Sequence, residues 1–270
     1  MTTFVRAAGK GRGIEATSLR FAFGIVTILL LWAARVIPIR IVNKPLLCVR
    51  GIVGGISALC LFIAIGHVGL GQTSVLYFSY PVFTALFASF FLGERPTLGT
   101  WCAIAVALAG EYLIVWPTSW SGVVAYKLLA VLGALLAGIA ITSVRRLRST
   151  DSSYTIFLSF CVFGLLIVAW PASRQSFAFG AGAWAALLGV GVMGTLGQLV
   201  MTFAYKFVPA TEGSVFSFFT PVLNLVLAAL IFHEQMPLRG WAGACLVIGA
   251  CIYVSVLKRG GAPTTPAGGN

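Results

Sequence analysis

Charged residues are scarce in this chain, and acidic residues are the scarcest. Only 9% of the 270 residues are charged, whereas a soluble domain carries about 25%. Six residues are acidic, two are histidines, and Asp151 is the single aspartate. Active sites and metal sites are usually built from clustered carboxylates, histidines and cysteines. We therefore predict no catalytic residues, no metal site and no enzymatic activity.

Nucleotide-binding and metal-binding motifs are missing as well. The sequence contains no GxxxxGK[ST] motif for ATP phosphates and no CxxC pair. Its cysteines all lie within or beside apolar runs, where they are expected to be small buried side chains. They are Cys48, Cys60, Cys102, Cys161, Cys245 and Cys251. We predict no cofactor, no disulfide framework and no use of ATP.

Long apolar stretches are abundant. Hydrophobic residues make up 59% of the chain, and the mean hydropathy is +1.01. A helix needs about 20 apolar residues to cross a bilayer. Nine such segments are present: 18–37, 46–66, 71–92, 97–116, 123–144, 153–171, 181–204, 209–232 and 238–257. The sequence therefore predicts an all-α polytopic membrane bundle of about nine transmembrane helices, with the lipid bilayer as its surroundings.

The net charge of +12 has its own pattern. The basic residues stand between the apolar runs and form no single face or arm, so we predict no nucleic-acid partner. Loops on one side, which includes the C-terminus, hold most of them. The positive-inside rule places that side in the cytoplasm. Arg20 and Arg50 lie near the starts of their helices, and we expect their side chains to extend to the lipid headgroups.

The chain contains an internal repeat. Residues 68–101 and 208–241 align without a gap at an offset of 140. Each copy has an apolar helix with a central proline, a terminal glutamate and a following helix that starts with tryptophan. The matching pairs are Pro81/Pro221, Glu94/Glu234 and Trp101/Trp241, with Gly51/Gly191 and Gly54/Gly194 upstream. Two copies of one helical unit are typical of carriers with a site where the copies meet.

The repeat divides the chain into a first unit at 1–117, a second at 118–257, and a Gly/Pro-rich tail at 258–270 that we predict to be disordered. The counterpart of helix 123–144 would fall before Met1, so the first unit has four helices and the second has five. A wrong start codon, a truncated gene and a genuine nine-helix form all explain this. Units of five helices insert with opposite orientations.

Two segments carry a family resemblance: PVFTALFASFFLGERPTLGTW and PVLNLVLAALIFHEQMPLRGW. They resemble the two repeats of the EamA family, in the drug/metabolite transporter superfamily. The resemblance extends over residues 1–257 and implies ten helices, an inverted repeat and a central cavity. It also implies transport of amino acids or other small metabolites across the cytoplasmic membrane. This chain lacks the family's first helix.

The polar residues around the two prolines form our predicted substrate site. Tyr77, Tyr80 and Thr84 are spaced to share one helix face, and Ser217, Thr220 and Asn224 occupy the same repeat positions. Polar stripes in lipid should face the interior. Gln198 and Tyr205 add a second polar set on helix 181–204. Pro81 and Pro221 each remove a backbone donor, so we expect kinks that serve as hinges.

Glu94 and Glu234 end their helices at the membrane edge, where the helix dipole disfavours a carboxylate. We predict a gate or a helix cap that uses neighbouring donors or the start of the next helix.

Taken together, the sequence predicts a secondary transporter that moves a small-molecule substrate by alternating access. The alternatives are a lipid or polyprenyl-carrier flippase of the same architecture and an inactive truncated paralogue. A homodimer could complete the bundle.

Overall fold

The computed structural model describes residues 13–68, 70–116, 123–175, 180–232 and 237–260. Within these ranges the chain is helical and contains no strand, which confirms the all-α prediction. The elements are α2 (Gly13–Ala33), α3 (Lys44–Val68), α4 (Leu70–Tyr77), α5 (Tyr80–Leu92), α6 (Leu98–Val115), α7 (Val124–Leu147), α8 (Ser153–Ala172), α9 (Ala181–Ala204), α10 (Ala210–Val215), the 3-10 helix η1 (Phe216–Phe218), α11 (Phe219–Phe232) and α12 (Leu238–Gly260).

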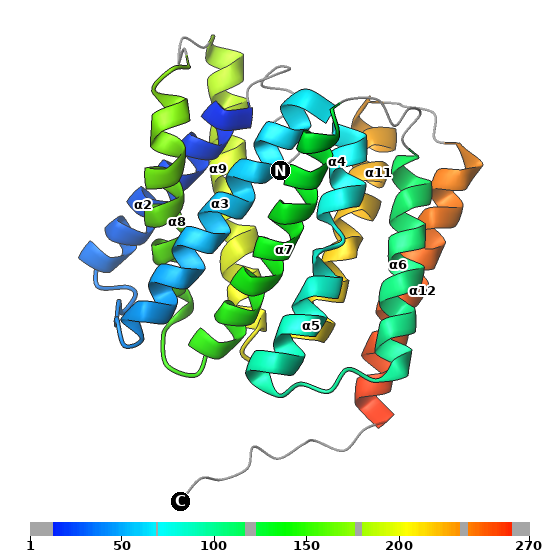
Figure 1. Ribbon diagram of the computed structural model, residues 1–270. Coiled ribbons are helices and arrows are strands. Elements are labelled where there is room, and N and C mark those ends of the chain that lie inside the picture. Colours follow the sequence, from blue (N-terminus) through cyan, green and yellow to red (C-terminus); the bar gives the residue numbers. More distant parts are fainter. Residues whose placement is uncertain (1–12, 69, 117–122, 176–179, 233–236, 261–270) are drawn as a thin grey trace, which may run out of the picture.

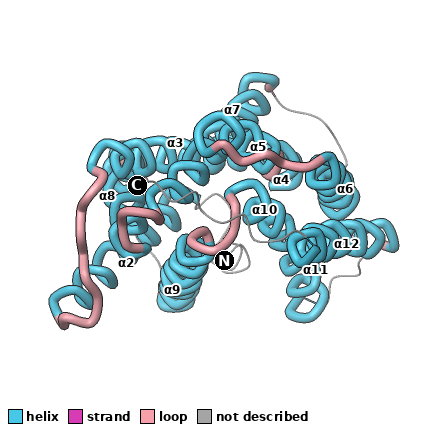
Figure 2. Tube along the Cα trace, turned by 90° about the horizontal axis from the view of Figure 1, so that it is seen from below, coloured by secondary structure: helices cyan, strands magenta, loops and turns pink. Residues whose placement is uncertain are grey.

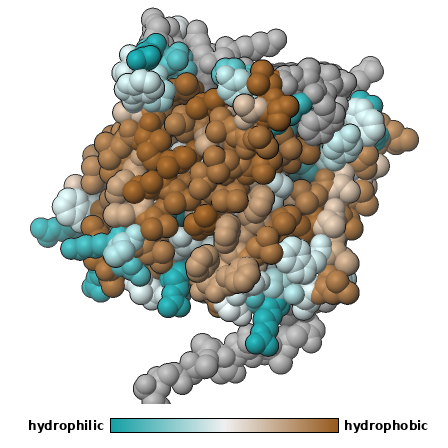
Figure 3. Space-filling model, viewed as in Figure 1, coloured by the Kyte–Doolittle hydropathy of each residue, from teal (hydrophilic) through white to brown (hydrophobic). Residues whose placement is uncertain are grey.

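Eight helical segments of the described chain are long and apolar enough to cross a membrane. One of them, Gln72–Leu92, joins α4 and α5. The ninth expected span, 209–232, corresponds to α10, η1 and α11, which follow one another without a loop. An apolar band covers the middle of the molecule, and polar residues gather towards its two ends (Figure 3). The chain is therefore a multi-pass membrane protein.

The first helix differs from the predicted one at both ends. We expected the first helix at 18–37, but α2 covers Gly13–Ala33. Arg35 takes a left-handed conformation (φ 60), and the Val36 N–H donates to the Leu31 carbonyl at 3.0 Å, which ends the helix with a tight turn. Pro38 also disfavours a helical residue before it.

At the other end of the chain, α12 continues to Gly260, so residues 258–260 are helical and not part of a disordered tail. The remaining residues of the predicted tail, 261–270, lie outside the described residues.

The two halves of the chain insert with opposite orientations. In Figure 1, α2 runs towards the end that carries the C-terminus, while α8, its repeat counterpart, runs away from it. Helices of the two halves also pack directly on each other. The main contacts of this kind are α2 with α8 and α9, α3 with α7 and α8, α4 with α7, α5 with α7 and α10, and α6 with α12. The interior is therefore largely an interface between repeats.

The end view separates two groups of helices (Figure 2). The first group contains α2, α3, α8 and α9, and the second contains α6, α11 and α12, with α4, α5, α7 and α10 between them. One apolar core joins Phe21 of α2 to Phe157 and Phe160 of α8. Phe21 and Phe160 meet edge to face, with ring centroids 5.1 Å apart. This core holds one repeat against the other beside the polar residues described next.

Candidate functional site between the two repeats

Two membrane-spanning segments are interrupted at equivalent positions. α4 ends at Tyr77 and α5 starts at Tyr80, with Pro81 as its second residue. In the second repeat the interruption is η1, Phe216–Phe218, which ends three residues before the paired Pro221. Proline cannot donate to the preceding turn and clashes with it, so each break follows from the sequence. Both breaks lie inside the apolar band, where exposed polar backbone needs partners.

Tyr77 lies at the first break, on the side of α3 and α7. Its hydroxyl is 3.0 Å from the Ser57 hydroxyl, and Ser57 donates to the Gly133 carbonyl at 2.8 Å. A serine hydroxyl has one proton, and Ser57 uses it on Gly133. Tyr77 is therefore the donor to Ser57, which leaves the lone pairs of the Tyr77 oxygen available to another donor.

Tyr80 connects the first break to the second. It is buried, and its ring lies 6.0 Å from the Tyr77 ring in an edge-on arrangement. Its hydroxyl lies near the side chain of Ser217 in η1. Ser217 in turn donates its proton to the Ser214 carbonyl. Tyr80 and Ser217 thus bring polar groups of the two repeats together at the point where both helices are broken.

Two residues of α9 and its end belong to the same region. Tyr205, directly after α9, is buried in one cluster with Tyr80, and Tyr77 packs against that cluster. Its carbonyl accepts a hydrogen bond from Arg145 at 2.7 Å. Gln198 is partly buried, and its Oε1 has no hydrogen-bond partner among the described residues. An amide oxygen of this kind can accept a hydrogen bond from a solute.

The predicted polar stripes come together only in part. Thr84 is fully buried, but its hydroxyl donates to the Tyr80 carbonyl at 3.0 Å within α5. Thr220 is exposed, contrary to the expectation that its stripe faces inward. The spacing argument assumed continuous helices, and both breaks change the direction of the side chains beyond them. The side chain of Asn224 lies outside what the structure describes.

Glu94 caps a helix of the other repeat. One carboxylate oxygen accepts the Ala210 N–H at 2.7 Å, and the other accepts the Thr211 N–H at 3.1 Å and the Thr211 hydroxyl at 2.9 Å. These donors form the start of α10. The next helix in sequence, α6, has its own cap in Thr97, which accepts from the Thr100 N–H. Glu234 lies outside the described residues.

Arg20 and Arg50 lie deeper than the sequence suggested, and Glu111 is buried as well. Arg50 is only 4% exposed, and its guanidinium carbon stands 4.2 Å above the centre of the Phe160 ring, so it does not extend to the headgroups. Arg20 is partly buried beside α9. Glu111 is fully buried in α6, and neither carboxyl oxygen has a hydrogen-bond partner in the described chain. Each arginine stands about two turns inside its helix, because α2 and α3 begin before the predicted starts at 18 and 46.

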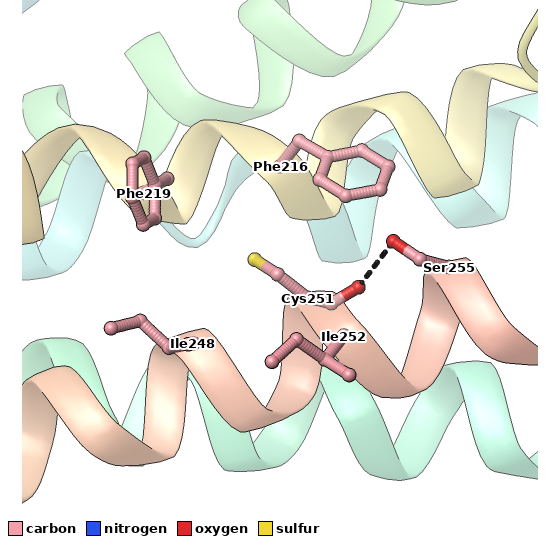
Figure 4. A pocket seen from close by; sticks show the side chains of 6 residues that line it. All are labelled: Phe216, Phe219, Ile248, Cys251, Ile252 and Ser255. Carbon is pink, nitrogen blue, oxygen red and sulfur yellow. Dashed lines mark hydrogen bonds between the residues drawn. The ribbon is translucent and has the colours of Figure 1, made fainter.

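A hollow of about 350 Å³ opens between η1, α11 and α12 and differs from this polar region (Figure 4). Its lining is mostly apolar. The lining residues are Phe216, Phe219, Ile248, Cys251, Ile252 and Ser255. The single hydrogen bond drawn there, from the Ser255 hydroxyl to the Cys251 carbonyl at 2.8 Å, lies within one helix. Such a surface suits lipid chains and offers little to orient a polar solute.

Known transporters are similar to this protein over nearly the whole chain. The EamA-like transporter family matches residues 1–116 and 125–256. The pseudopaline exporter CntI of Pseudomonas aeruginosa is 32% identical over 248 residues, which cover 91% of this chain and 87% of the exporter. The riboflavin transporter of Rhizobium johnstonii is 30% identical over 219 residues, covering 80% and 70% of the two chains.

A solved crystal structure shares the fold. Its TM-score is 0.84, at 18% sequence identity, and the superposition covers 96% of this chain and 92% of the other. The family match, the relatives and the two inverted units agree with one another, and they describe a transporter and not an enzyme. The chain therefore belongs to the EamA-like transporter family.

Proposed function

We propose that the protein is a secondary transporter that moves a small amphipathic metabolite, such as an amino acid, across the cytoplasmic membrane by alternating access. Membership of a transporter family and relatives named for the export of pseudopaline and the transport of riboflavin support this proposal. The basic loops, which gather at the end that carries the C-terminus, support a cytoplasmic C-terminus.

The single observation that supports this site most strongly is the proximity of Tyr80 to Tyr205, in one buried cluster, and to Ser217, both residues of the second repeat. It joins two broken helices of opposite orientation within the apolar band, which is where inverted-repeat carriers place their substrates. The Tyr77 oxygen and Gln198 Oε1 supply hydrogen-bond acceptors nearby. The surrounding tyrosine rings supply apolar area, so the region fits a solute with one polar and one apolar part.

The breaks also suggest how the protein changes conformation. A helix interrupted at Pro81 or Pro221 bends at lower cost than a continuous one, because proline lacks the N–H that would bond to the preceding turn. Glu94 holds α5 to the start of α10, so these elements of different repeats are expected to move together. Bending at the breaks would then open the polar region to one side and close it to the other.

A metabolite comparison tests the proposal for a substrate of any identity. Intracellular and extracellular metabolites are compared between bacteria that express the wild type, the Tyr80→Phe/Ser217→Ala double variant, or no transporter. Tyr253→Phe is the matched control, because Tyr253 lies exposed on α12. We expect the wild type and the control to redistribute the same metabolites, and the double variant at equal membrane levels to redistribute none.

Two results would contradict the proposal. The first is an identical metabolite distribution in cells with and without the wild-type protein, which would show that the protein does not transport a metabolite. The second is full activity of the double variant, which would show that Tyr80 and Ser217 do not form the substrate site, although the protein is a transporter.

A further inference from the structure

Two guanidinium groups of the first repeat lie against helices of the second repeat. Arg50 of α3 stacks on Phe160 of α8. Arg20 of α2 runs alongside Gly194 of α9, where an added Cβ would stand 2.8 Å from the Arg20 Nε atom. The two arginines interact electrostatically with each other and with Tyr77. They therefore belong to the same inter-repeat region as the polar residues around the helix breaks.

The positive charge of this pair has no counter-charge in the described part of the chain. Arginine stays protonated in proteins. The groups that act on Arg20 are Cys161 and Tyr77, and Arg50 has Tyr205 in addition. Thiols and phenols are neutral near pH 7. The Arg50 Nε atom also lacks a hydrogen-bond partner among the described residues.

The carboxylates whose hydrogen bonds are known bind backbone N–H groups in other parts of the molecule. Glu94 binds the start of α10, and Asp151 accepts the backbone N–H groups of Val42 at 2.9 Å and Asn43 at 3.2 Å. A buried cation beside a partly buried one, without an anion, is unfavourable, because burial removes the water that would screen their charge. A protein that keeps such a pair needs an anion to complete it.

Glycines at equivalent positions of the two repeats leave room for the two arginine side chains. Gly54 and Gly194 are repeat equivalents, and each faces one arginine: a Cβ on Gly54 would collide with Nη1 of Arg50. Arg20 is itself the repeat equivalent of Phe160. The site is therefore asymmetric, with guanidinium groups from the first repeat and an aromatic ring from the second.

We propose that Arg20 and Arg50 bind the carboxylate group, or an equivalent oxyanion, of the transported solute. This inference rests on the proposed function and narrows its substrates to solutes that carry a carboxylate or an equivalent oxyanion. The guanidinium fork presents parallel N–H donors that match the two oxygens of a carboxylate. The Phe160 and Tyr77 rings lie beside the guanidiniums and fit the apolar part of the same solute.

Thermal unfolding of the purified protein tests the pair with a minimal probe. Benzoate carries a carboxylate on an aromatic ring, and benzamide has the same shape without the charge. In neutral detergent at constant ionic strength, we expect benzoate to raise the Tm of the wild type and benzamide to leave it unchanged. Arg146→Gln, an exposed arginine at the end of α7, is the control and should respond like the wild type.

Variants of the pair separate binding from folding. Arg20→Gln/Arg50→Gln should lose the benzoate response. If that double variant does not fold, the Tm of Arg50→Lys is measured instead. Lysine keeps the positive charge but lacks the paired N–H donors of the guanidinium group. We therefore expect this variant to need about tenfold more benzoate for the same rise in Tm. Equal effects of benzoate and benzamide on the wild type, or a wild-type benzoate response in these variants, would overturn the proposal.

A phospholipid phosphate has the same oxyanion chemistry, so one arm of the experiment adds phosphatidylglycerol or phosphatidylcholine to the micelles. If phosphatidylglycerol stabilises the protein and benzoate does not displace this lipid, the arginines bind lipid and the proposal is overturned.

In the metabolite comparison, every solute moved by the wild type should carry a carboxylate or phosphate. Moved solutes that carry neither a carboxylate nor a phosphate would overturn the inference but leave the proposed transport intact. Absence of any moved solute would refute the transport proposal, while the benzoate arm still tests the arginines.

Discussion

Replacing Glu94 tests whether the two repeats are joined at the start of α10. The carboxylate accepts three hydrogen bonds there, from Ala210 N–H, Thr211 N–H and the Thr211 hydroxyl. Alanine removes all three acceptor contacts and the negative charge at the positive end of the helix. Glutamine keeps the length of the side chain and one acceptor oxygen, while its NH₂ group points a donor at other donors.

The expected magnitude follows from these contacts. A hydrogen bond to a charged group contributes about 1.5–3 kcal/mol, and the helix dipole adds about 0.3–1 kcal/mol. Glu94 is only partly buried, so water replaces some of the lost contacts. We therefore expect the free energy of unfolding to fall by about 2–4 kcal/mol in Glu94→Ala and by about 1–2 kcal/mol in Glu94→Gln.

Unfolding of the purified protein by dodecyl sulfate in mixed micelles, followed by tryptophan fluorescence, measures these changes. Arg95→Gln is the matched control, because Arg95 is the exposed neighbour on the same turn and should leave stability unchanged. If Glu94→Ala and Glu94→Gln both stay within about 0.5 kcal/mol of the wild type, the carboxylate does not hold α10 and the reasoning fails.

Two further substitutions follow from buried carboxyl groups and use the same unfolding assay. Asp151→Ala removes the acceptor of two backbone N–H groups before α3 and should cost about 2–4 kcal/mol; wild-type stability would show that the turn holds without it. Glu111→Leu replaces a fully buried carboxyl, without a hydrogen-bond partner in the described chain, by an apolar group of similar size. It should raise stability by about 1–3 kcal/mol, and a loss of stability would reveal a partner for Glu111.

The transmembrane helices were predictable because they depend on local properties. Most ends agree with the apolar runs to within a few residues, as in α8 and α9, since a polar residue rarely remains inside a lipid-facing segment. Pro81 and Pro221 marked both breaks, because a missing N–H acts on its own helix. The end of α2 was missed because the turn at Arg35 stops the helix before the apolar run ends.

Contacts between the repeats were not predictable in the same way. The sequence indicated that Glu94 needed donors, but the donors lie on α10, more than a hundred residues away. Arg50 stood near a helix start, where extension to the headgroups and burial on Phe160 have the same sequence signature. Hydropathy gives the membrane depth of a residue, and only packing decides which neighbour its side chain meets.

Solute flux through the purified protein in liposomes tests the central claim most directly. The solute is the metabolite that the wild type redistributes in cells, and Tyr80→Phe and Ser217→Ala are measured beside it. We expect initial rates to fall by about tenfold or more in each variant, which corresponds to about 1.4 kcal/mol of lost stabilisation, with unchanged thermal unfolding. Wild-type rates in both variants would show that the solute does not pass between the broken helices.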